Sequence, residues 1–129
     1  MGSYIVCDDK KIKNIDFAIS SKEQELGLMF EKDPKILVFL YTQPKIRKFW
    51  MKNCNFPLDI VFIKSNKIIA IEKGESNTEN LIGPDKESDF VIEFPFGYCK
   101  ENDLAIGKSI KLKLGKKVLK KLFQMTTEK

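Results

Sequence analysis

Short apolar segments separated by turn residues run through this 129-residue chain, and their spacing limits what it can fold into. The segments are rich in Ile, Val and Phe and are bounded by Gly, Pro, Asn, Asp or Ser, a pattern typical of strands and turns. A chain of this length forms one domain with a single core. The sequence therefore predicts a mainly β domain (α+β by strict count) over residues 4–114, a compact antiparallel barrel-like arrangement, closed or nearly so, with one or two short helices. The predicted strands are 4–7, 12–19, 36–41, 58–63, 67–71, 90–94 and 109–114.

Two hairpins and a helix are predicted within this domain. Residues 4–7 pair with 12–19, and residues 58–63 pair with 67–71 across the tight turn Ser65-Asn66. Ser20 or Ser21 begins a helix, because Glu or Gln follows each at the capping-box spacing, and Gly27 ends it. We expect this helix, at about residues 21–28, to pack over one end of the barrel.

The C-terminal tail, residues 115–129, has a different pattern. Its apolar residues, Val118, Leu119, Leu122 and Phe123, recur at helical spacing with lysines between them. This predicts a basic amphipathic helix over 116–125. Docking on its own domain or on a protein partner is the favoured interpretation, and contact with an anionic membrane surface is the alternative.

Composition excludes several kinds of function. The net charge is +5, but Arg47 is the single arginine among 23 basic residues, so specific nucleic-acid recognition is not expected. The chain has no histidine, which excludes Ser-His and Cys-His catalysis and most zinc sites. We expect no metal and no cofactor. The three cysteines, Cys7, Cys54 and Cys99, are widely spaced and are expected to be free thiols.

The cellular compartment stays open. No apolar run approaches the roughly 18 residues of a membrane helix. The start, MGSYIVC, lacks the charged region and the long apolar region of a signal peptide. Met-Gly-Ser is also typical of a cloning remnant, so the sequence is equally consistent with an export leader that has been removed.

The stretch FWMKNCNFPLDIVFI, residues 49–63, holds the only Trp and mixes polar with bulky apolar residues. Phe49 to Met51 resemble a strand, Pro57 interrupts pairing, and Leu58 begins the next strand, so we predict a strand, a polar corner and a strand. Trp50 is expected to be buried, since a large aromatic residue in an apolar run rarely stays in water.

Two interpretations of this corner remain. In the favoured one, Lys52 and Asp59 tie the corner together and Asn53 bonds the backbone. In the other, a ligand-binding cleft is lined by polar groups within an aromatic wall. The candidate binding residues are Trp50, Lys52, Asn53, Asp59 and Glu93.

At the level of function, a non-catalytic binding or structural module is favoured. The partner would be a small ligand or a protein. The alternative is an enzyme that uses Lys52 with Asp59 or Glu93 as acid and base, but these groups lack a suitable unperturbed pKa. Cys54 as a nucleophile is a weaker alternative, because its thiolate would depend on Lys52 alone.

The order of these motifs resembles one known family, domain of unknown function 192, also called UPF0127. The resemblance covers about residues 12–114. It rests first on FWMKN followed by PLDI, with GLM at 27–29 and VIE..FG at 91–97 in support. Cys54 stands where the family usually has Thr, Lys108 replaces the Asp of a closing Gly-Asp, and the Gly that often precedes the 36–41 strand is absent. The resemblance implies a compact β-rich domain, frequently exported in bacteria, with no established enzymatic activity.

Overall fold

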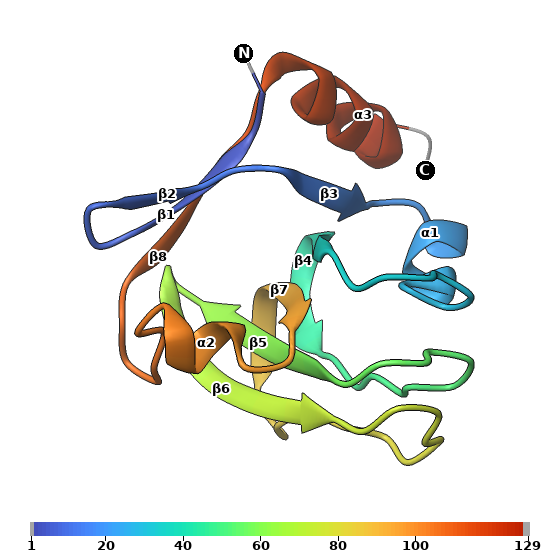
Figure 1. The fold of residues 1–129 in the computed structure, drawn as a ribbon. Helices are drawn as coiled ribbons and strands as arrows, with labels where there is room; N and C mark the ends of the chain where they lie inside the picture. Colours follow the sequence, from blue (N-terminus) through green and yellow to red (C-terminus); the bar gives the residue numbers. More distant parts are fainter. Residues whose placement is uncertain (1, 128–129) are drawn as a thin grey trace.

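The structure is a computed structural model that describes residues 2–127, in which two β-sheets and three helices are present (Figure 1). The strands are β1 (Tyr4–Cys7), β2 (Lys10–Ile12), β3 (Ile15–Ala18), β4 (Ile36–Ile46), β5 (Leu58–Lys64), β6 (Lys67–Gly74), β7 (Glu87–Pro95) and β8 (Ile110–Lys113), and the helices are α1 (Ser21–Leu26), α2 (Tyr98–Glu101) and α3 (Lys116–Thr127). The smaller sheet has the order β2-β1-β8 and the larger the order β3-β4-β7-β5-β6. The predicted mainly β class is confirmed, but the sheets face each other without closing into a barrel.

The first predicted hairpin needs a correction. β1 and β2 do pair antiparallel, but β3 leaves them and joins the larger sheet parallel to β4. Asn14, between β2 and β3, has a φ of 58°, in the left-handed region that redirects a chain. The prediction of one strand over 12–19 was wrong for this reason.

The second predicted hairpin is confirmed, since β5 pairs antiparallel with β6. Ser65 and Asn66 connect the strands with φ of 52° and 61°. Positive φ at both central residues is the geometry that follows the twist of a hairpin.

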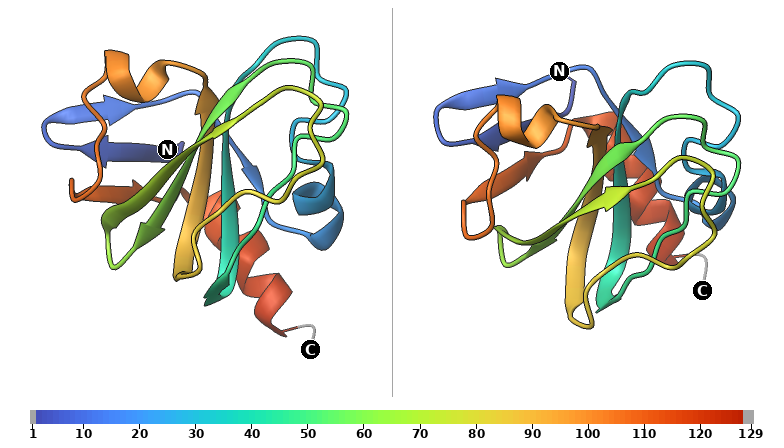
Figure 2. Two further views of the ribbon diagram at one scale, coloured as in Figure 1. Left: turned by 90° about the horizontal axis from the view of Figure 1, so that it is seen from below. Right: turned by 60° about the horizontal axis from the view of Figure 1, so that its bottom comes forward.

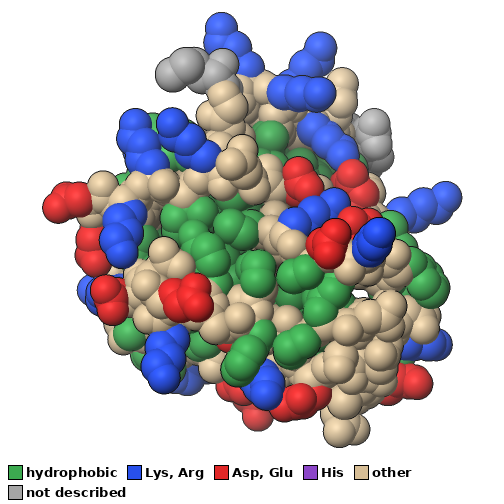
Figure 3. All heavy atoms as spheres, viewed as in Figure 1, with side chains coloured by type: hydrophobic (Ala, Val, Ile, Leu, Met, Phe, Trp, Pro, Cys, Tyr) green, Lys and Arg blue, Asp and Glu red, His purple; other side chains and the backbone are tan. Residues whose placement is uncertain are grey.

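Both faces of the larger sheet are covered. Successive side chains of a strand point to opposite faces, and every residue of β5 from Leu58 to Ile63 is buried. One face packs against the smaller sheet, and we call its apolar contacts the inter-sheet cluster; it includes Ile5, Val38, Val61, Ile92 and Ile110. The other face packs against loops, and we call its contacts the loop-side cluster; it includes Leu28, Phe39, Met51, Cys54, Leu58, Ile60 and Phe62. In the view of Figure 3, hydrophobic side chains fill the middle of the molecule and basic side chains gather over α3.

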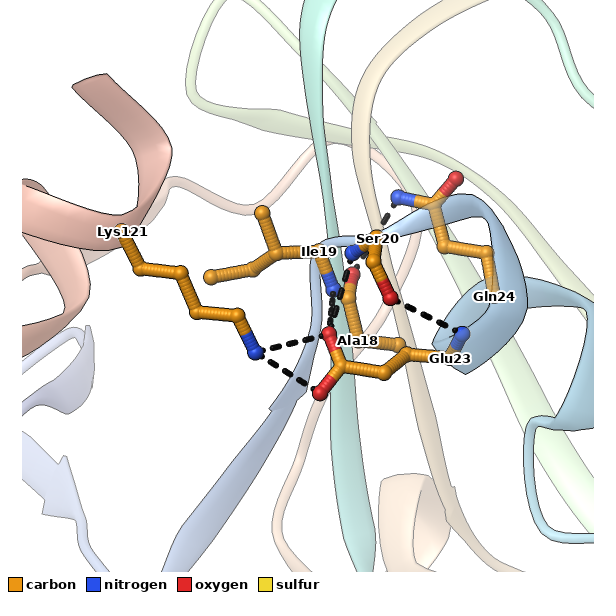
Figure 4. A network of polar contacts seen from close by, with 6 residues as sticks. All are labelled: Ala18, Ile19, Ser20, Glu23, Gln24 and Lys121. Carbon is orange, nitrogen blue, oxygen red and sulfur yellow. Dashed lines mark hydrogen bonds and ion pairs between the residues drawn. The ribbon is translucent and has the colours of Figure 1, made fainter. Parts of the chain in front are cut away.

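The Glu23 side chain links α1 to Lys121 of α3 (Figure 4). The predicted capping box is confirmed: the Glu23 amide donates to Ser20 Oγ at 3.1 Å, and the Ser20 amide donates to Glu23 Oε1 at 3.0 Å. Lys121 of α3 lies 2.7 Å from Glu23 Oε2. Val118, Leu122 and Met125 pack against the inter-sheet cluster. Residues 128 and 129 of the predicted tail lie outside the described residues.

All three cysteines are free, as the sequence predicts, and the structure places all three in buried positions. None of the helices within residues 2–127 is long and apolar enough to span a membrane.

Candidate ligand-binding site

Three loops lie side by side next to α1 and cover the outer face of the larger sheet (Figures 1 and 2). We call them the loop layer. The Phe30 amide donates to the Asn53 carbonyl at 2.9 Å, and the Met51 amide donates to the Thr78 carbonyl at 2.9 Å. The loops contain no regular strand, and these backbone hydrogen bonds hold them to one another. The loop layer consists of residues 27–35, 47–57 and 75–86.

A cavity of about 430 Å³ lies between the loop layer, α1 and the sheet. This is within the usual size range of small-molecule sites, about 300–1,000 Å³. Its lining is mostly apolar and aromatic, with a few polar groups. The lining includes Gly27, Phe39, Tyr41, Arg47, Phe49, Trp50, Lys52, Cys54 and Glu93.

Glu93 is the polar group buried deepest in this lining. It lies near the end of β7, on the sheet face that carries the loop-side cluster, and only 4% of its surface is exposed. Its Oε1 atom has no hydrogen-bond partner among the described residues. A Cβ placed on Gly27 would lie 3.9 Å from that atom, so the carboxyl faces the turn at the end of α1. Burial raises the pKa of Glu93 to about 8, and the carboxyl is therefore mostly protonated at neutral pH.

Tyr41 and Arg47 form a second polar element of the cavity. The Arg47 guanidinium lies 3.6 Å from the centre of the Tyr41 ring. One guanidinium nitrogen donates to the Gln43 carbonyl at 3.1 Å, whereas the Nε atom is buried without a partner among the described residues. Burial raises the pKa of the Tyr41 hydroxyl and outweighs the lowering by the Arg47 guanidinium, so the hydroxyl stays protonated.

Cys54 is buried in the same lining and is not an activated thiol. Burial raises the pKa of Cys54, although its contact with the Phe56 carbonyl lowers it in part. A nucleophilic cysteine needs a lowered pKa, so the geometry disfavours this role.

Trp50 and Lys52 both belong to the lining and are both exposed. The prediction that Trp50 is buried was wrong, because 41% of its surface is exposed. Phe49 makes only an isolated bridge with Ile82, so residues 49–51 form no strand with a buried face, and Met51 is the residue of this run that is buried. The Lys52 ammonium lies 5.1 Å from the centre of the Trp50 ring.

The Asp59 carboxylate lies on the other side of the sheet and outside the cavity lining. It accepts hydrogen bonds from the amides of Gly97 at 3.1 Å and Cys99 at 3.0 Å, at the start of α2. No ion pair joins it to Lys52 within residues 2–127. Asn53 also lies outside the lining; its φ is 58° and its carbonyl holds the Phe30 amide. The cavity thus brings together Trp50, Lys52 and Glu93, but not Asn53 or Asp59.

The lining residues that were not among the sequence candidates include Gly27, Tyr41 and Arg47. Each lies in a different stretch of sequence, so spacing does not connect them. The one available signal was that Arg47 is the single arginine. No group of three or more Asp, Glu or Cys side chains suited to a metal ion occurs within residues 2–127.

The fold and the cavity define a class: a two-sheet β domain with a loop-covered cavity that contains a buried carboxyl group. The chain belongs to the DUF192 family, whose model, described as "Uncharacterized ACR", matches residues 4–112. A comparison with curated proteins finds no match.

Two solved structures share the fold. One is a protein of unknown function from Novosphingobium aromaticivorans, with a TM-score of 0.75 and 23% identity, covering 84% of this chain and 82% of that one. The other, from Sinorhizobium meliloti, is called a "putative transcription regulator"; its TM-score is 0.76 at 22% identity, covering 85% of this chain and 91% of that one. Identities this low support the fold and carry no function across.

Proposed function

We propose that the protein is a non-catalytic binding module that takes a small ligand into the cavity under the loop layer. The main support for this proposal is that the Glu93 carboxyl is buried in the lining and its Oε1 atom has no hydrogen-bond partner among the described residues. A buried polar group without a hydrogen bond costs free energy, and such a group is uncommon in a domain that needs only stability. A ligand donor would satisfy it.

The rest of the lining supports the same function. Phe39 and Phe49 pack edge to face, with ring centres 4.9 Å apart, and Trp50 is partly exposed in the same lining. Apolar walls with few convergent polar groups are the usual composition of a small-molecule site. The single Trp also provides a reporter of occupancy.

A fragment screen by protein NMR tests this function. Fragments that bind should shift the Trp50 indole signal together with amide signals of the loop layer, and Glu93→Leu should weaken them. Glu87→Gln is the matched control, since Glu87 lies on the same strand but is exposed and outside the lining. A library in which no fragment shifts these signals would contradict the proposal.

The second candidate is an enzyme with Glu93 as a general acid. It is favoured by the pKa of about 8, which keeps a proton available at neutral pH. Lys52 would be its second group, whereas Asp59 is engaged by the amides at the start of α2. Chemical change of a bound fragment, lost in Glu93→Gln, would favour this candidate over binding alone.

A further inference from the structure

The cavity has one buried acceptor and one buried donor without partners among the described residues. Glu93 Oε1 is the acceptor, since a protonated carboxyl keeps one oxygen that accepts a hydrogen bond, and Arg47 Nε is the donor; both residues line the cavity. Tyr41 lines the same cavity, and the Arg47 guanidinium lies 3.6 Å from the centre of its ring. A ligand that matches the site therefore offers a donor to one residue and an acceptor to the other.

The charge of the lining favours an anionic group as that acceptor. Lys48 is paired with Asp85 at 2.8 Å, but Arg47 and Lys52 have no acidic partner among the described residues. The acidic residues of the lining are Glu25, which is exposed, and Glu93, which is mostly protonated at neutral pH. The cavity is therefore net positive around its polar groups, and an acid is attracted there.

The aromatic faces argue against a cationic ligand. Aromatic faces bind ammonium groups when they are free to do so. Here Arg47 already covers Tyr41 at 3.6 Å, and Lys52 lies over Trp50 at 5.1 Å. A cation would have to displace one of these groups and would be repelled by the other.

We propose that the ligand is a small organic acid with an apolar body about the size of one ring and a hydroxyl or N–H donor opposite its acidic group. The acid lies between Arg47 and Lys52, the body lies against Phe49 and Trp50, and the donor reaches Glu93. This inference rests on the proposed function and specifies the chemical class of its ligand.

A matched set of ring compounds tests the class. The probes are 4-hydroxybenzoate, which has the acid and the donor; benzoate, which lacks the donor; and tyramine, which has the donor and a cation. Binding is measured through Trp50 fluorescence and NMR at neutral pH and constant ionic strength. We expect 4-hydroxybenzoate to bind at least about tenfold more tightly than tyramine and severalfold more tightly than benzoate, as expected for one charge contact and one hydrogen bond.

Variants assign each contact. Glu93→Leu should bring the affinity ratio of 4-hydroxybenzoate to benzoate close to one, while Glu93→Gln, which keeps an acceptor, should retain part of it. Lys52→Met should weaken both acids severalfold and leave tyramine unchanged or stronger. Lys86→Met is the control, because Lys86 is an exposed loop lysine outside the lining.

The outcomes separate this inference from the function it rests on. Equal or tighter binding of tyramine would overturn the acid class, and so would acid binding that Lys52→Met leaves unchanged. If none of the three probes binds but other fragments shift the loop-layer signals, the class is wrong and the binding function stands. If neither probes nor fragments shift these signals, the binding function fails as well.

Discussion

Glu93 is the residue at which stability and the proposed binding function oppose each other. Its carboxyl lies between Leu37 and Ile60 of the neighbouring strands, in a sheet face that is otherwise apolar. An apolar residue of similar size would avoid the cost of burying an unpartnered polar atom. Binding sites commonly accept such a cost, which is recovered when the ligand supplies the missing partner.

The pH dependence of folding should reveal this cost. The ordinary pKa of 4.5 applies to Glu93 in the unfolded chain, and burial raises the pKa to about 8 in the folded state. The folded state therefore holds more protons between these values, so the contribution of Glu93 to the free energy of unfolding is greatest below pH 4.5 and is lost as pH rises through 8. Denaturant titrations from pH 5 to 8.5 should show a loss of a few kcal/mol that Glu93→Gln removes.

Glu23 titrates below this pH range, so it does not affect the predicted loss of stability between pH 5 and 8.5. Burial opposes the shift, but hydrogen bonds from Lys121 and from the Ser20 and Ile19 amides lower the pKa of Glu23 to about 2. Its contribution is complete above pH 4.5 and is lost as pH falls through 2. An identical slope for the wild type and Glu93→Gln between pH 5 and 8.5 would contradict the role assigned to Glu93.

Asp59 and Lys52 should contribute independently to stability. Asp59→Asn replaces a buried carboxylate that accepts two amide hydrogen bonds and should cost about 1–3 kcal/mol. Lys52→Met changes an exposed side chain and should cost less than about 0.5 kcal/mol. Because the sheet separates the two groups, the double mutant should be additive within about 0.5 kcal/mol. A coupling energy above about 1 kcal/mol would restore the interpretation in which this pair ties the corner together.

At the scale of elements, α3 has one face on the domain and one in solvent. Leu122 packs against the inter-sheet cluster, whereas Leu119 is 50% exposed. Leu122→Ala should lower the free energy of unfolding by roughly 1–2 kcal/mol, and Leu119→Ala should change it by less than about 0.5 kcal/mol. The comparison is well controlled because both substitutions remove the same atoms from the same helix.

Binding to anionic vesicles tests the alternative role of α3, contact with a membrane surface. If both substitutions leave stability unchanged while Leu119→Ala weakens binding to anionic vesicles, contact with a membrane surface replaces docking as the role of the helix. The Lys121–Glu23 pair is exposed on both sides and should add little to stability by itself.

For the whole molecule, the reactivity of the cysteines measures how easily two different parts of the core open. Cys7 and Cys99 lie in the inter-sheet cluster, and Cys54 lies in the loop-side cluster beneath the loop layer. Loops held by few bonds open more easily than paired sheets, so the loop layer should open locally without global unfolding. A thiol reagent should therefore modify Cys54 first, at a rate independent of denaturant at low concentration. Modification of all three thiols at one common rate would show that the layers open only together.

The sequence by itself determined the elements whose causes are local. The capping box at Ser20 and Glu23, the hairpin across Ser65 and Asn66 and the mainly β class all follow from residues within a few positions of one another. The free state of the cysteines also followed from their spacing.

The residues of the candidate site could not be predicted from local sequence. Lys52 and Asp59 are close in sequence, yet side-chain alternation on β5 and the start of α2 place Asp59 on the opposite side of the sheet from the cavity. Gly27, Tyr41, Arg47 and Glu93 are far apart in sequence and converge because β4 and β7 are neighbours and the loop layer folds over them. Phe49 and Met51 both pack in the loop-side cluster, and the side chain of Trp50 between them stays exposed. Pairing between distant strands is the physical reason, since it decides which strands are neighbours and therefore which distant side chains share a face of the sheet.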